Sequence, residues 1–283
     1  MKLPALACDC HVHVIGDEAS YPMAPRRHYT PGPAGHDDLL AHMARLSLER
    51  AVLVQPSVYG FDNRCMLDSL KRMGGSGRGI AVLPETVDED ELAHLAGNGV
   101  TGIRINLESA CNRDAGAMRD GLALWADRVA DFGWHIQLYA SFNVIEAALD
   151  SFRNLPVPIV LDHFAMIPAA AGLNEPGIRR LLRQLGGGKL YVKLSAAYRI
   201  SARQDQHRVP GLAAALIDAN PERVVWGSDW PHTSRDPGIA ATQVSAYRPI
   251  GAQDLADELG AWLGTEALAH RVLVDNPGRL YRF

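Results

Sequence analysis

The stretch Cys8-Asp9-Cys10-His11-Val12-His13-Val14 lies close to the N-terminus and has the apolar alternation of a buried β-strand. It also contains two histidines that a core strand does not need. In a strand, residues two apart point to the same side, with Cα atoms roughly 6.5–7 Å apart. We therefore expect Asp9, His11 and His13 to share one face, and the residues between them to face the covering helices. Two imidazoles placed in this way can converge on one small ligand, ion or carbonyl oxygen.

Seven further aliphatic runs follow this one, separated by segments with helical periodicity. The segment from Asp37 to Leu46, for example, opens with acids and places Leu39, Met43 and Leu46 at helical spacing. Near-continuous apolar strands that alternate with helices are typical of a parallel sheet covered on both faces. Eight such units without a break in composition predict an α/β fold, a closed (β/α)8 TIM barrel that forms a single domain over residues 1–283. The expected strands are Cys8–Val14, Ala51–Gln55, Gly79–Leu83, Gly102–Asn106, Trp134–Tyr139, Ile159–His163, Leu190–Ser195 and Arg223–Gly227.

The alternative architecture is an open, doubly wound sheet. No G-x-G-x-x-G or P-loop motif follows an early strand, and the glycine run at 186–188 precedes a strand instead of following one. These observations favour the barrel. The expected helices cover residues 37–46, 88–95, 115–132, 143–152, 177–185 and 211–219.

The composition is that of an ordinary globular protein. Apolar residues make up 47% and charged residues 21% of the 283 residues, and the net charge is -4. Acids and bases are interspersed, so no clustered basic face suggests a nucleic-acid partner. No apolar run approaches the ~18 residues of a membrane span. The four cysteines form no C-x-x-C pair, which favours reduced thiols and a cytoplasmic protein.

Polar residues gather where the predicted strands end, which is where a barrel places its active site. Three histidines and an aspartate on one rim favour a functional site over a structural one. By contrast, we expect His135 alone to be a satisfied core residue. We expect six other histidines to be exposed: His28, His36, His42, His94, His207 and His270. The polar strand ends are His11 and His13, Gln55 to Tyr59, Arg104 and Asn106, Tyr139, Asp162 and His163, Tyr198 and Arg199, and Trp226 to His232.

Three of these motifs carry a family resemblance. Asp9-Cys10-His11-Val12-His13, Leu161-Asp162-His163 and Trp226-Gly227-Ser228-Asp229-Trp230-Pro231-His232 resemble the amidohydrolase superfamily. The chain is most similar to the branch that contains 2-pyrone-4,6-dicarboxylate lactonase and related sugar-lactone hydrolases, and the similarity runs over nearly its whole length. The resemblance implies a hydrolase that acts on a cyclic ester, such as a carboxylated pyrone, a muconolactone or a sugar lactone.

The resemblance also implies catalytic roles. Asp229 matches the carboxylate that deprotonates water, and His11, His13 and His163 match the histidines that polarise the carbonyl. Hydrolysis of a lactone needs such a base and such an electrophile. Asp229 suits the role of base if its surroundings raise its pKa toward the working pH. The alternative for Asp229 is a structural carboxylate that pairs with a neighbouring histidine.

The candidate substrate-binding residues begin with two arginines, because a guanidinium matches a carboxylate through two parallel hydrogen bonds. Arg199 matches a substrate-binding arginine of the dicarboxylate lactonase. Arg104 either binds substrate in the same way or forms a buried structural ion pair. The remaining candidates contact the substrate or simply fill the barrel mouth: Ser57, Tyr59, Tyr139 and His232.

The chain departs from the superfamily pattern at its metal ligands. Many members have a lysine or glutamate on the fourth strand and a histidine on the fifth, where this chain has Arg104 and Gln137 to Tyr139. A two-metal site is therefore not expected. The lactonase branch implies hydrolysis without a metal, and we expect no cofactor. The alternative is one divalent zinc or manganese held by His11, His13 and Asp229, since three protein ligands and a water make a catalytic site.

A second departure concerns the substrate. The dicarboxylate lactonase has a further arginine after the fourth strand, and the matching position here is Ala110. Arg113 in the same loop is a possible substitute. A lactone with one carboxylate or several hydroxyls fits as well as a pyrone dicarboxylate.

Two rival functions stay open beside the lactonase. One is a metal-dependent decarboxylase or amide hydrolase on the same barrel. The other is a non-catalytic binding protein, which would be expected to lose part of the histidine and aspartate set that is present in full. The expected partner is a small-molecule substrate, and the oligomeric state is left open.

Overall fold

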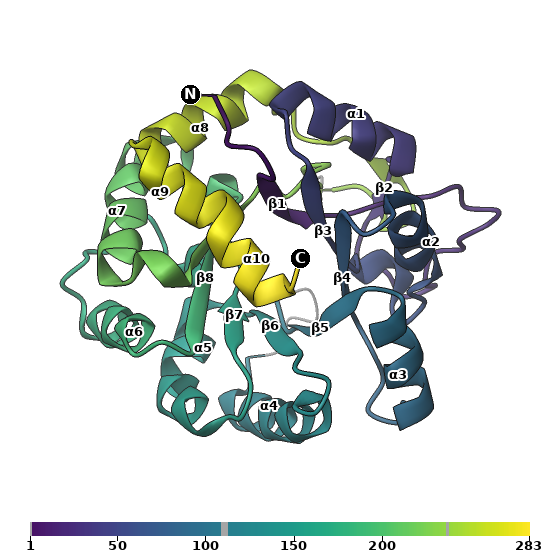
Figure 1. The fold of residues 1–283 in the computed structure, drawn as a ribbon, viewed down its shortest axis with the longest axis horizontal. Coiled ribbons are helices and arrows are strands. Elements are labelled where there is room, and N and C mark those ends of the chain that lie inside the picture. Colours follow the sequence, from purple (N-terminus) through teal and green to yellow (C-terminus); the bar gives the residue numbers. More distant parts are fainter. Residues whose placement is uncertain (1, 109–112, 236–237) are drawn as a thin grey trace.

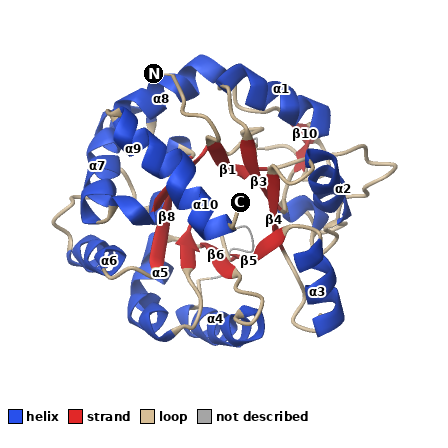
Figure 2. Ribbon diagram, viewed as in Figure 1, coloured by secondary structure: helices blue, strands red, loops and turns tan. Residues whose placement is uncertain are grey.

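The computed structural model describes residues 2–108, 113–235 and 238–283. Within these residues, eight parallel strands form one sheet in the order β1-β3-β4-β5-β6-β7-β8-β9, and helices surround it (Figures 1 and 2). The ring closes where Val12 bridges to Trp230 in parallel. There the His13 amide donates to the Trp230 carbonyl at 2.8 Å, and the Asp229 amide donates to the His11 carbonyl at 2.9 Å. The predicted (β/α)8 barrel is confirmed.

Every strand of the barrel begins and ends within two residues of its predicted boundary. Most of their residues are buried because one face packs on the helices and the other fills the barrel. Their bounds are β1 Cys8–Val12, β3 Arg50–Val54, β4 Gly77–Ala81, β5 Val100–Asn106, β6 His135–Tyr139, β7 Ile159–Leu161, β8 Leu190–Ser195 and β9 Val224–Gly227.

The helices cover the outside of the barrel. In α1 the predicted stripe of Leu39, Met43 and Leu46 is buried. The sequence analysis did not predict α2 or the helices after β9. Two short strands, β2 Thr30–Pro31 and β10 Val244–Ser245, pair outside the barrel. The helix bounds are α1 His36–Leu46, α2 Arg64–Met73, α3 Glu89–Gly97, α4 Ala115–Val129, α5 Phe142–Ala148, α6 Pro176–Gly186, α7 Val209–Ala219, α8 Ala252–Leu263, α9 Glu266–His270 and α10 Asn276–Tyr281.

An irregularity in β1 changes which residues face the barrel interior. Asp9 pairs with Ala51, but Val12 pairs with Leu53, so β1 advances three residues while β3 advances two. One extra residue therefore lies in β1, and it reverses the alternation of faces. The prediction that Asp9 shares a face with the two histidines is wrong, as is the prediction that Cys10 faces the helices. Cys10 and Cys8 pack inside the barrel with Val52, Val54, Ile80, Val160, Tyr191 and Val225.

Asp9 instead faces α1. Its Oδ2 lies 3.4 Å from Nε2 of His42, whose ring stacks on Trp230 with 5.6 Å between the centroids. His42 and His36 are both buried, so the prediction that they are exposed is wrong. The carboxylate of Asp9 also accepts from the amide of Ser228, which ties the start of the chain to the turn after β9.

The C-terminal helix covers the amino end of the barrel. Figure 1 shows α10 crossing the ring of strands, and its Leu280 and Tyr281 pack into the interior cluster. His135 lies there with its ring 5.2 Å from that of Tyr281. The ring is buried as predicted, but its Nε2 has no hydrogen-bond partner among the residues that the structure describes. The helix α10 therefore closes the end of the barrel that lies opposite the carboxyl ends of the strands.

Within the residues that the structure describes, none of the helices combines the length and apolar character needed to cross a membrane.

Candidate active site

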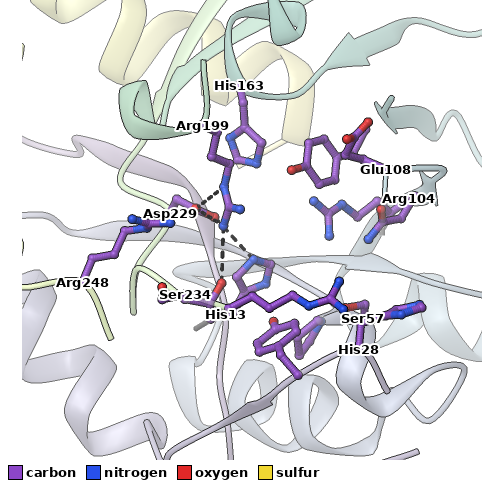
Figure 3. A pocket seen from close by; sticks show the side chains of 16 residues that line it. His13, His28, Ser57, Arg104, Glu108, His163, Arg199, Asp229, Ser234 and Arg248 are labelled. Carbon is purple, nitrogen blue, oxygen red and sulfur yellow. Dashed lines mark hydrogen bonds and ion pairs between the residues drawn. The ribbon is translucent and has the colours of Figure 1, made fainter. Parts of the chain in front are cut away.

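A pocket of about 310 Å3 opens at the carboxyl ends of the strands (Figure 3). It brings together most of the predicted site residues, while His11 lies directly beneath it. Tyr59 and His232 do not line it. The Tyr59 hydroxyl accepts from the Gly16 amide at 3.0 Å, and the His232 ring lies 6.4 Å from that of His42. The predicted residues that line the pocket are His13, Ser57, Arg104, Tyr139, His163, Arg199 and Asp229.

Asp229 stands on a strained turn immediately after β9. Its φ of 62° is in the left-handed region, which costs a non-glycine residue about 1–3 kcal/mol and persists only where surrounding contacts impose it. Two contacts hold this turn: the Ser228 amide donates to Asp9 Oδ1 at 2.9 Å, and the Trp230 amide donates to Ser228 Oγ at 2.9 Å. Gly227 before it has no room for a side chain, because a Cβ there would lie 2.5 Å from His11 Cβ.

The two oxygens of Asp229 have different surroundings. Oδ2 accepts from the Tyr198 hydroxyl at 2.6 Å and from Arg199 Nε and Nη2 at 2.9 and 2.7 Å. Within the described part of the chain, Oδ1 has no hydrogen-bond partner, and it faces Nε2 of His11 at 3.5 Å and Nε2 of His13 at 3.6 Å. Burial opposes ionisation of Asp229, but Arg199 and the nearby histidines outweigh it and hold its pKa well below the usual range. The pKa is therefore lowered, whereas the proposed base role called for a raised one.

The histidines are held through their Nδ1 atoms. His13 Nδ1 lies 2.7 Å from the Val54 carbonyl, which only an N–H can satisfy, so a neutral ring carries its lone pair on Nε2. His163 Nδ1 lies 2.8 Å from the Ser195 hydroxyl. If that hydroxyl donates, the proton of His163 resides on Nε2. Burial and Lys193 together lower the pKa of His11 to about 3, which keeps it neutral.

A buried charge cluster supports this site from below. Asp162 Oδ2 accepts from Arg104 Nε and Nη2 at 3.2 and 3.1 Å and from Gln137 at 3.0 Å. Lys193 Nζ lies 3.3 Å from Asp162 Oδ1, 2.8 Å from Gln137 Oε1 and 3.2 Å from His11 Nδ1. Of the two roles open for Arg104, the structure thus shows the buried ion pair, although the side chain also lines the pocket.

Lys193 is a residue that the sequence analysis missed. The sequence feature that could have indicated it is a charged residue in the middle of an apolar strand. Lys193 lies two residues from Tyr191 and from Ser195, and all three side chains face inward. A fully buried ammonium is costly unless it is paired, and Asp162 provides the pair. Burial lowers the pKa of Lys193, while Asp162 opposes that shift.

Several pocket residues come from loops that gave no sequence signal. Tyr29 and His28 precede β2, Glu108 follows β5, and four more follow β9. His28 is exposed as predicted and borders the opening. Ala110 lies outside the described residues, and Arg113 donates to both oxygens of Glu108 at 2.8 and 3.1 Å. The residues after β9 are Thr233, Ser234, Arg235 and Arg248.

The cluster of Asp229, His11 and His13 has the composition of a metal site. One ligand atom from each lies within 4.8 Å of the others. His11 Nε2 and Asp229 Oδ1 are buried without a hydrogen-bond partner in residues 2–108, 113–235 and 238–283, which is costly unless another group satisfies them. Two imidazole nitrogens and a carboxylate oxygen are ligands that zinc accepts. The residues present therefore fit one divalent ion.

The fold and the site together define a class of protein. A closed (β/α)8 barrel that presents histidines and a carboxylate at the carboxyl ends of its strands has the architecture of a barrel enzyme. More particularly, the chain belongs to the amidohydrolase family, whose model matches residues 8–283. The predicted superfamily is confirmed.

Relatives support the same branch. The chain is 33% identical over 286 residues to a 4-sulfomuconolactone hydrolase of Rhizobium radiobacter, covering 99% of this chain and 91% of the relative. It is 32% identical to a 2-pyrone-4,6-dicarboxylate hydrolase of Comamonas testosteroni, with the same two coverages of 99% and 91%. A solved structure of a putative 2-pyrone-4,6-dicarboxylic acid hydrolase from Pseudomonas putida superposes with a TM-score of 0.81 at 30% identity, covering 99% and 98% of the two chains.

Proposed function

We propose that the protein hydrolyses a lactone, by attack of water on the ring carbonyl. The observation that carries this proposal is the arrangement of Asp229, whose Oδ1 is free and faces two imidazoles inside the pocket while Arg199 and Tyr198 hold Oδ2. A carboxylate fixed in this way can accept a proton from water without changing its position. The relatives named as lactone hydrolases support the same reaction class.

The chain supplies each element of the reaction. Asp229 Oδ1 accepts a proton as the water oxygen bonds to the carbonyl carbon. The carbonyl oxygen then becomes an oxyanion, which His163 stabilises when its Nε2 carries the proton. Collapse of this intermediate breaks the bond from the acyl carbon to the ring oxygen. The leaving alkoxide takes up the proton held by Asp229, so one water is consumed and a hydroxy acid is released.

Two buried atoms of the site are left without hydrogen-bond partners among the described residues, Nε2 of His11 and Oδ1 of Asp229. Together with His13 they offer the ligand atoms that one divalent ion accepts. This geometry supports a bound divalent ion, the alternative that the sequence analysis placed second, with His11, His13 and Asp229 as its ligands. Such an ion polarises a carbonyl and lowers the pKa of water bound to it.

A screen of lactones with a pH indicator tests the reaction class. The panel contains carboxylated pyrones, muconolactones and sugar lactones, each assayed with the native protein and with Asp229→Asn. The proposal expects acid release from at least one lactone with the native protein and little with the variant. Acid release at equal rates from both proteins, or from no lactone, would contradict it.

A further inference from the structure

The arginines that line the pocket differ in whether a carboxylate of the protein already pairs with the guanidinium group. Arg104 donates through Nε and Nη2 to Asp162, and Arg199 donates through the same two atoms to Asp229. Each therefore presents to the pocket a guanidinium whose charge is matched by a buried carboxylate. Such a pair attracts a substrate anion less than an unpaired guanidinium does.

Arg248 differs from these two arginines. Among the described residues it forms no ion pair, and its Nε is buried without a hydrogen-bond partner. Its guanidinium carbon lies 4.6 Å from the centroid of the Tyr198 ring. Its backbone amide donates to the His232 carbonyl at 3.0 Å, which fixes it to the turn that carries Asp229. Figure 3 shows its head group beside Asp229, on the side of the pocket away from Arg104.

The opposite side of the pocket already contains carboxylates. There Glu108 lines the pocket on the same side as Arg104 (Figure 3). Glu108 accepts two hydrogen bonds from Arg113. A substrate carboxylate placed there would meet the Arg113–Glu108 and Arg104–Asp162 pairs, in which each guanidinium is already matched by a carboxylate. Hydroxyl groups, by contrast, can donate to Glu108 without a loss of charge complementarity. The pocket is thus polarised, with an anion-accepting side at Arg248 and a hydroxyl-accepting side at Glu108.

We propose that Arg248 is the residue that determines specificity by binding the carboxylate of a lactone with a single negative charge. The neutral, hydroxyl-bearing part of the substrate faces Glu108, and the ring carbonyl lies between them, at Asp229 and His13. This inference rests on the proposed lactone hydrolysis. It goes further by assigning the substrate's charge and its orientation in the pocket.

The test compares Arg248→Met with Arg179→Met, which removes the same charge from the exposed face of α6. The substrates are a γ-lactone that bears one carboxylate and the same lactone with a carboxamide in its place. In Arg248→Met, KM for the carboxylate should rise roughly 10- to 100-fold, the effect of one charge-assisted hydrogen-bonded pair. KM for the carboxamide should stay within about twofold. Arg248→Lys should recover part of the loss, and Arg179→Met should change neither value.

Equal changes for the two lactones, or none, would overturn the role of Arg248. A lactone with a second carboxylate that the native protein prefers more than about tenfold would overturn the assigned orientation. Calorimetric binding of the carboxylate lactone to Asp229→Asn, with and without the Arg248 change, separates the two proposals. If the native protein hydrolyses neither lactone, the proposal of lactone hydrolysis is wrong. The binding role of Arg248 is judged separately from the calorimetric affinity. An affinity about tenfold weaker without Arg248 supports that role, and an unchanged affinity refutes it.

Discussion

Replacing Arg199 by methionine removes the guanidinium that compensates the buried charge of Asp229. Two charge-assisted hydrogen bonds are lost, at 2.9 and 2.7 Å, and Oδ2 keeps only the bond from Tyr198. Breaking a buried ion pair from one side costs about 3–5 kcal/mol. Because the Arg199 side chain is 22% exposed and Tyr198 remains, we expect a loss of about 2–3 kcal/mol in the free energy of unfolding at neutral pH.

The loss should depend on pH in a defined direction. A carboxyl whose pKa is depressed in the folded state stabilises the fold above its unfolded pKa, and this contribution disappears as the pH falls through the folded pKa. Asp229 is such a group because of Arg199. The difference between native protein and variant should therefore be full at neutral pH and shrink below about pH 4, where the unfolded aspartate begins to protonate.

Urea unfolding at neutral pH and below about pH 4 measures the difference in the free energy of unfolding between native protein and variant. A chelator is present so that no bound ion holds Asp229. Arg199→Lys keeps the positive charge and should lose less, while Arg179→Met, at an exposed position of α6, controls for a general change of net charge. A loss of less than about 0.5 kcal/mol at neutral pH, or an equal loss at both pH values, would refute the view that Arg199 compensates Asp229.

The remaining predictions concern the base, the ion and the barrel seam. Asp229→Asn should lower kcat on the best lactone by at least ~10², and a parental rate would exclude Asp229 as the base. Elemental analysis should find zinc or manganese in the protein, and exhaustive chelation should abolish activity that the returned ion restores; full activity without metal would instead favour the metal-free alternative. Gly227→Ala should strongly lower the yield of folded protein, since its Cβ would lie 2.7 Å from the backbone nitrogen of His11, and circular dichroism identical to that of the native protein would contradict this.

The parts of this protein that follow from periodicity were predictable from the sequence. Alternating apolar strands and amphipathic helices define the barrel, and strand ends define the rim on which His13, His163 and Asp229 meet. The face of Asp9 was not predictable in this way, because one extra residue in β1 reverses the alternation and leaves no mark in the pattern of residue types. Because of this extra residue, Cys8 and Cys10 fill the barrel. Asp9 instead accepts a hydrogen bond from the turn that carries Asp229.

Other features depend on contacts between distant residues. The pKa of Asp229 is lowered by Arg199, thirty positions earlier, so no local reading of the turn after β9 gives its direction. A charged residue within an apolar strand weakly indicates a special role for Lys193. Its partners cannot be predicted from that strand, because His11, Gln137 and Asp162 come from β1, β6 and the end of β7. Arg248 lies in a segment without periodicity, and only the folded chain places it beside the site.

Hydrolysis in water labelled with oxygen-18 tests the central claim most directly. Native protein and Asp229→Asn are each given the best lactone, and the product is analysed by mass spectrometry. If water attacks the ring carbonyl with Asp229 as base, the native protein should place one labelled oxygen in the new carboxylate and none in the new hydroxyl, and the variant should release little product. Label in the hydroxyl, or equal product from both proteins, would contradict the account.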